Sequence, residues 1–112
     1  MPISIIFKDG KLRKLCNEYK EAVRKLGPKC AKILRQRLDD LHAAETLADF
    51  RNLPGDCHEY KGEDVLTLDL DGGRRLMFRP AEDPIPRLPD GVSLDWSRIS
   101  SVEIIFIGDP HG

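Results

Sequence analysis

The sequence lacks any long hydrophobic run. It has 112 residues, of which 40% are hydrophobic and 33% charged, and no stretch approaches the roughly 20 apolar residues that cross a membrane. Residues 1–8 contain neither a basic leading segment nor a small-residue cleavage site, so we expect no signal peptide. We therefore predict a cytoplasmic protein with no membrane partner.

Cysteine is scarce. Cys16, Cys30 and Cys57 are odd in number and widely spaced, and they fit neither a disulfide framework nor a zinc site. We expect reduced thiols, as in other cytosolic proteins. The sequence also lacks metal-ligand spacing, a glycine-rich phosphate loop and a nucleophile elbow. We therefore predict no metal and no cofactor.

Charge is present but unevenly distributed. The net charge is −1, yet residues 1–38 hold eleven Lys or Arg against three Asp or Glu, a local charge of +8, and residues 39–112 carry −9. A chain with one basic half can meet a polyanion with one surface. The alternative is that these groups are the solvated faces of two helices, and the pattern leaves both interpretations open.

Hydrophobic periodicity predicts a strand followed by two helices. Residues 3–7 are rich in β-branched and aromatic groups, which favours a strand. Helical spacing predicts an amphipathic helix over residues 10–26, capped by Asp9. Gly27-Pro28 ends this helix and begins a second one, so the two should form an antiparallel hairpin. The apolar face of the second helix is predicted from Cys30, Ile33, Leu34, Leu38 and Leu41.

After the loop signal at residues 52–55, the spacing of hydrophobic residues changes from the helical period of 3.6 residues to the strand period of 2. Residues 65–70 and 74–79 alternate as strands, and Asp71-Gly72-Gly73 between them is a tight turn. Residues 80–95, rich in Pro, Asp and Gly, are predicted to be an inserted surface loop that Trp96 packs down. Residues 102–107 are apolar on both faces, which favours a central strand.

The order of these elements indicates an α+β fold in which a helical hairpin packs on one face of a mainly antiparallel sheet. Within the strand at residues 74–79, Leu76 and Phe78 should face the core, and Arg75, Met77 and Arg79 should face the other way. We interpret residues 1–112 as a single domain with a loop insertion at about 80–95.

The candidate chemistry rests on histidine and arginine. His42 lies near a helix end, where it favours the helix dipole, whereas His58 and His111 are candidates for proton transfer. RNA cleavage removes a proton from the 2′-hydroxyl, delivers one to the 5′-oxygen, and builds negative charge that Arg75, Arg79 or Lys61 could stabilise. The alternative is that the arginine pair only solvates a sheet face.

Several short runs, in this order and spacing, resemble the HigB branch of the RelE/ParE toxin superfamily. The runs are Leu53-Pro54-Gly55, His58-Glu59-Tyr60-Lys61-Gly62, Leu68-Asp69-Leu70-Asp71-Gly72, Arg75-Leu76-Met77-Phe78 and Asp109-Pro110-His111. The resemblance covers nearly the whole chain apart from residues 80–95.

The resemblance implies a RelE-like microbial RNase-type fold and a toxin of a type II toxin–antitoxin system that cleaves mRNA on the ribosome without a metal. It implies a helix-turn-helix, HigA-like antitoxin as partner, with the toxin in a complex with it or in a homo-oligomer. The catalytic residues it implies are His58, Arg75, Asp109 and His111. The resemblance implies that Lys61 contacts phosphate, and we expect Arg74 and Arg79 to bind RNA with it.

The chain departs from this family in three respects. Its net charge is −1, whereas these toxins are typically basic. Pro110 stands where the family commonly has Tyr, and the segment Lys61-Gly62-Glu63-Asp64 is acidic where relatives continue with basic residues. Two other functions therefore stay open. One is a ParE-type toxin that binds DNA gyrase without cleaving RNA, and the other is a decayed toxin that only binds its antitoxin.

Overall fold

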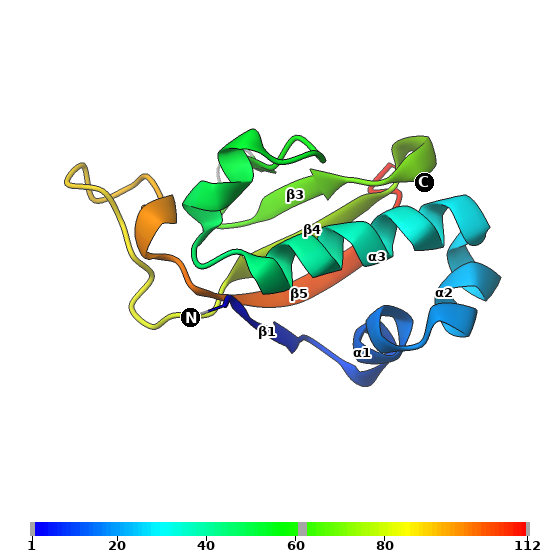
Figure 1. Ribbon diagram of the computed structural model, residues 1–112. Helices are drawn as coiled ribbons and strands as arrows, with labels where there is room; N and C mark the ends of the chain where they lie inside the picture. Colours follow the sequence, from blue (N-terminus) through cyan, green and yellow to red (C-terminus); the bar gives the residue numbers. More distant parts are fainter. Residues whose placement is uncertain (1, 61–62, 112) are drawn as a thin grey trace.

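The computed structural model describes residues 2–60 and 63–111, and it has an α+β fold (Figure 1). Its strands are β1 (Ser4–Phe7), β2 (His58–Glu59), β3 (Leu66–Asp69), β4 (Arg75–Pro80) and β5 (Ser101–Gly108). Its α-helices are α1 (Gly10–Asn17), α2 (Tyr19–Leu26) and α3 (Pro28–Ala43), and its short 3₁₀ helices are η1 (Leu47–Asn52), η2 (Asp71–Gly73) and η3 (Trp96–Arg98).

The strands form one sheet in the order β1-β5-β4-β3-β2. The β1/β5 pair is parallel, and the other three pairs are antiparallel, which confirms the mainly antiparallel sheet. The strand expected near residue 102 is β5, and it lies inside the sheet between β1 and β4 as predicted. The loop signal after residue 52 and the turn at Asp71–Gly73 also lie where the sequence placed them.

Helix α3 lies across one face of this sheet (Figure 1). The core forms between them because alternate strand side chains point toward the helix. Buried residues from both layers include Leu34, Leu41, Leu68, Phe78 and Ile104, each 0–1% exposed. The predicted helical hairpin is present as α2 and α3, which pack against each other and are joined through Gly27.

The single helix expected over residues 10–26 is wrong, because the chain bends at Glu18. This residue has φ −117° and ψ 105°, which ends α1 and begins α2. Leu15 of α1 is buried toward β1 and β5, whereas Ala22 and Leu26 of α2 are buried against α3. One straight helix cannot serve both directions, so packing overrides a continuous helical periodicity. Tyr19, at the start of α2, is 44% exposed.

The segment at residues 80–95 is a loop, as expected, but it is held by specific contacts. Arg87 and Leu94 form an isolated antiparallel bridge. The Arg87 guanidinium donates two hydrogen bonds to the Asp64 carboxylate, at 3.1 and 2.7 Å. Leu94 is 3% exposed and Trp96 5% exposed. The loop is therefore anchored both to the core and to the segment that precedes β3.

Candidate functional site

The sheet face away from α3 carries the predicted site residues. Strand registers pair His58 with Thr67, Thr67 with Met77, and Met77 with Phe106. Directly paired residues share a face, so all four side chains point the same way, opposite to the buried Leu68 and Phe78. We call this surface the open face. Its residues are Ile6, His58, Thr67, Asp69, Arg75, Met77, Arg79, Glu103 and Phe106. Thr67 is the buried member of this set, at 1% exposed.

Arg75 lies directly opposite Gly108 in the β4/β5 register. Asp109 and His111 follow Gly108, so the end of the chain lies beside Arg75. The Asp109 carboxylate also approaches the turn that precedes β4, because its Oδ2 lies 3.9 Å from the position a Cβ would take on Gly73. The structure therefore places the backbone of Asp109 and His111 at the end of the sheet where Arg75 lies, and we call these three residues with Asp69 the Arg75 cluster.

Two acidic groups organise the Arg75 cluster. Asp69, paired with Arg75 across β3 and β4, forms an ion pair with its guanidinium. Asp109 accepts a hydrogen bond from the backbone N–H of His111 through Oδ1 at 2.9 Å. Asp69 therefore restrains the guanidinium, and Asp109 shapes the backbone that carries the His111 imidazole, which is exposed.

His58 lies on the same face but at the sheet edge. It is two strands away from Arg75, about 10 Å across the sheet. Its Nδ1 lies 2.7 Å from the carbonyl oxygen of Asp56, and a carbonyl only accepts, so the neutral ring carries its proton on Nδ1. Its Nε2 is then an acceptor, with only a 3.4 Å contact from the Thr67 hydroxyl. His58 is thus able to take up a proton but stands apart from the Arg75 cluster.

The three residues expected to bind RNA are placed differently. Arg79 is exposed at the far end of β4, opposite Glu103. Arg74 does not lie with them, because its Nη1 donates to the carbonyl oxygen of Leu26 at 2.9 Å and so ties the sheet to the end of α2. Lys61 lies outside the described residues.

Phe106 is a residue of this face that sequence reasoning missed. Residues 102–107 showed no alternation, so nothing indicated which side chains point outward. In the structure Phe106 is 37% exposed, whereas Val102 and Ile104 of the same strand are fully buried. Its ring lies over Gly108, with Cζ 3.3 Å from the position that a Cβ would occupy there. An aromatic ring therefore borders the Arg75 cluster.

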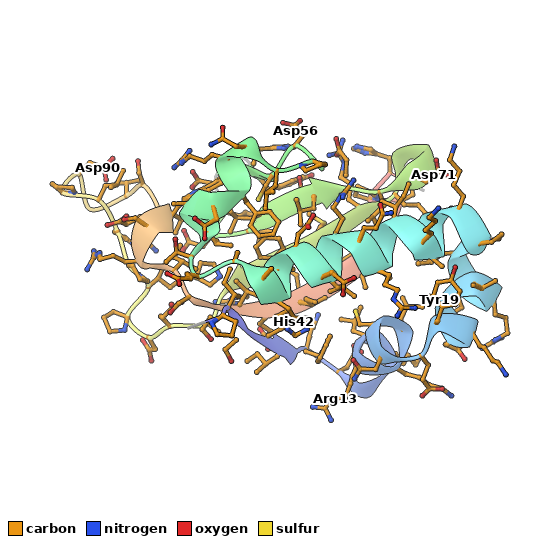
Figure 2. The ribbon with its side chains drawn as sticks, in the orientation of Figure 1. Arg13, Tyr19, His42, Asp56, Asp71 and Asp90 are labelled. Atoms are coloured by element: carbon orange, nitrogen blue, oxygen red, sulfur yellow. The ribbon has the colours of Figure 1, made fainter. Side chains whose placement is uncertain are left out.

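A groove of about 280 Å³ lies on the other side of the molecule, between α3 and the first two helices. Its apolar lining includes Phe7, Leu15 and Leu38. Tyr19 and His42, both labelled in Figure 2, line it too. The guanidinium of Arg13 lies 6.0 Å from the centre of the Phe7 ring, and that of Arg35 lies 5.9 Å from the centre of the Tyr19 ring.

Within residues 2–60 and 63–111, no three His, Cys, Asp or Glu side chains gather closely enough to hold a metal ion. None of the helices in the described part of the chain is both long and apolar enough to cross a membrane. Comparison with protein-family models, with curated proteins and with solved structures found no match. The site is therefore interpreted from its own chemistry.

Proposed function

We propose that this protein is an mRNA endonuclease toxin of the RelE/ParE type, HigB-like, which cleaves RNA without a metal on the ribosome. The observation that carries the proposal is the direct pairing of Arg75 with Gly108. It supports a site in which a cation and an imidazole act on one phosphate. The open sheet face around it gives an extended single strand room to bind.

The proposed reaction is attack of the 2′-hydroxyl on the adjacent phosphorus. The bond to the 5′-oxygen breaks, leaving a 2′,3′-cyclic phosphate and a free 5′-hydroxyl. Arg75 stabilises the negative charge that develops on the phosphoryl oxygens. We assign His111 as the acid beside Arg75, and His58, whose Nε2 has only the long Thr67 contact, as the base for a 2′-hydroxyl that lies over β3, between β2 and the phosphate at Arg75. His58 lies on β2 and His111 follows β5, and β4, which carries Arg75, lies between these two strands in the sheet. The two histidines are therefore on opposite sides of Arg75, as a base and an acid should be.

We also propose a partner, an antitoxin of the HigA-like, helix-turn-helix class, that docks an acidic amphipathic segment in the groove beside α3. The apolar lining of the groove suits the hydrophobic side of such a segment. Arg13 and Arg35, stacked on the Phe7 and Tyr19 rings, supply charge for its acidic side. The proposed location is the cytoplasm, which the free cysteines support.

The test is controlled expression in bacteria with transcript integrity as the readout. Wild-type protein should arrest growth and deplete full-length mRNA. His111→Ala should relieve both effects, while Arg24→Ala, on the exposed outer side of α2, should not. Growth arrest with intact transcripts and relaxed chromosomal DNA would instead favour the gyrase-binding alternative. A wild-type chain that neither arrests growth nor cleaves RNA would contradict the proposal and favour an antitoxin-binding role alone.

A further inference from the structure

A bulge in β5 determines where Phe106 points. Met77 pairs with Phe106, but the next residue of β4, Phe78, pairs with Ile104, so Ile105 is an extra residue in β5. Side chains alternate along a strand, and one extra residue moves those beyond it to the other face. Without the bulge Phe106 would join Ile104 in the core. With it, the ring stands on the open face.

Gly108 then fixes where the ring rests. Phe106 Cζ and Cε2 lie 3.3 and 3.6 Å from the position of a Cβ on Gly108, so a side chain there would displace the ring. Gly108 is directly opposite Arg75. The ring therefore lies on β5, whereas Asp69 holds the guanidinium on the β3 side of the neighbouring strand β4, and the ring remains 37% exposed.

An exposed ring on β5 and a fixed cation held toward β3 suit a ligand that combines a flat π system with a negative charge a short distance away. A nucleotide has both, because every base presents a π face and its phosphate lies one sugar away. We propose that Phe106 and Gly108 form a stacking subsite for one unpaired nucleobase whose phosphate contacts Arg75. This inference rests on the proposed function and specifies which residues bind one nucleotide of the RNA strand.

The subsite also gives the bulge a role. Bulges re-aim side chains and are frequent beside functional sites.

The other large apolar side chain exposed on this face, Ile6, lies on β1 opposite Glu103 and away from Arg75. It is the matched control, because it shares the face and the exposure of Phe106 but lacks the ring and the cation.

The experiment uses the full chain and a single-stranded RNA that carries 2-aminopurine next to a 2′-O-methyl nucleotide, which blocks cleavage. Stacking on Phe106 should quench the fluorescence of the purine. Phe106→Leu should abolish the quench and weaken binding by about 10-fold, within the range for one base stacked on an aromatic side chain. Phe106→Tyr and Ile6→Leu should retain both.

A second variant separates loss of the ring from a change in fold. Gly108→Ala keeps the ring but places a methyl group where the ring rests, and it also strains the backbone because Gly108 has φ +153°. It should reduce the quench, and its thermal unfolding midpoint is measured to separate that effect from backbone strain. The midpoint of Phe106→Leu should stay near that of wild type. Equal quenching in wild type and Phe106→Leu would overturn the subsite. A second result would also overturn the subsite: a wild-type protein that is a dimer, and a Phe106→Leu variant that is a monomer but binds RNA as well as wild type.

The same variants are compared for cleavage of mRNA on translating ribosomes, which keeps the two proposals apart. If wild type cleaves and Phe106→Leu cleaves at an equal rate, the subsite is wrong and the endonuclease stands. If wild type neither binds the RNA nor cleaves mRNA on the ribosome, the proposed function fails and the subsite fails with it.

Discussion

Arg75 and Gly108 face each other across β4 and β5, and this pairing brings the end of the chain to Arg75. Glycine at position 108 leaves room on the open face, and Asp109 and His111 follow at once. The relationship joins two segments more than 30 residues apart in the sequence. It is the geometric basis of the proposed cleavage site.

Asp109 is expected to act through the backbone of His111. Its Oδ1 accepts the His111 N–H at 2.9 Å, so Asp109→Ala should loosen the imidazole and lower the cleavage rate by about tenfold, the equivalent of one hydrogen bond. Asp109→Asn keeps an acceptor oxygen and should retain most of the activity. The measurement is the single-turnover rate of both variants. If Asn and Ala are equally damaging, the carboxylate charge matters and this positioning role is wrong.

Arg74 is expected to contribute stability and not activity. Its hydrogen bond to the Leu26 carbonyl links β4 to the helical hairpin. Arg74→Ala should lower the free energy of unfolding by about 1–2 kcal/mol, at the lower end for hydrogen bonds from charged groups. Lys29→Ala, which removes an exposed ion pair with Asp71 at 3.4 Å, should cost less than about 1 kcal/mol. Urea denaturation measures both, and an Arg74→Ala protein that is fully stable but inactive would restore Arg74 as an RNA contact.

The Arg87–Asp64 pair should make stability depend on acid pH. The hydrogen bond from Arg87 lowers the pKa of the Asp64 carboxyl below its ordinary value of 3.8. A carboxyl with a lowered folded-state pKa stabilises the fold above its unfolded pKa, and that contribution is lost as pH falls through the folded value. The advantage of wild type over Asp64→Asn in urea should therefore shrink below about pH 4. Arg87→Gln should show the same loss, and a constant advantage down to pH 2 would contradict this assignment.

The cysteines should react slowly in the folded protein. Burial raises the pKa of the Cys16 thiol to about 12, and burial together with the Asp56 charge raises that of Cys57 to about 12. Cys30 is 1% exposed. Since the thiolate is the reactive species, alkylation by iodoacetamide at pH 8 should be at least about tenfold slower in native protein than in denaturant. Rapid labelling of Cys16 or Cys57 in the native state would show that these thiols are more accessible than the structure indicates.

The sequence was sufficient for features that depend on local pattern. Alternation along residues 74–79 predicted that Arg75 and Arg79 share a face away from the core, and Gly27-Pro28 predicted the break between the helices of the hairpin. The α+β class followed from the order of these elements. Such features can be predicted because each depends on residues that are close together in the sequence.

Long-range packing determined what the sequence could not predict. Nothing near Glu18 indicates that α1 and α2 must turn toward different partners, and nothing in residues 102–107 reveals the bulge that exposes Phe106. Arg74 and Arg75 are adjacent and chemically alike, yet one reaches a helix carbonyl and the other a carboxylate across the sheet. Alternation predicts that they point to opposite faces, but only the packing of the helical hairpin against the sheet shows that Arg74 reaches the Leu26 carbonyl.

The most direct test of the account is the chemistry of the cleaved ends when purified protein acts on mRNA held by translating ribosomes. The enzyme is assayed both untreated and after EDTA treatment that removes any bound metal. Wild type should produce 2′,3′-cyclic phosphate and 5′-hydroxyl ends. Arg75→Ala should slow their formation by about 10²–10³-fold, as expected for loss of a group that stabilises developing charge, and Arg24→Ala should be neutral. Cleavage by Arg75→Ala at the wild-type rate would contradict the central claim.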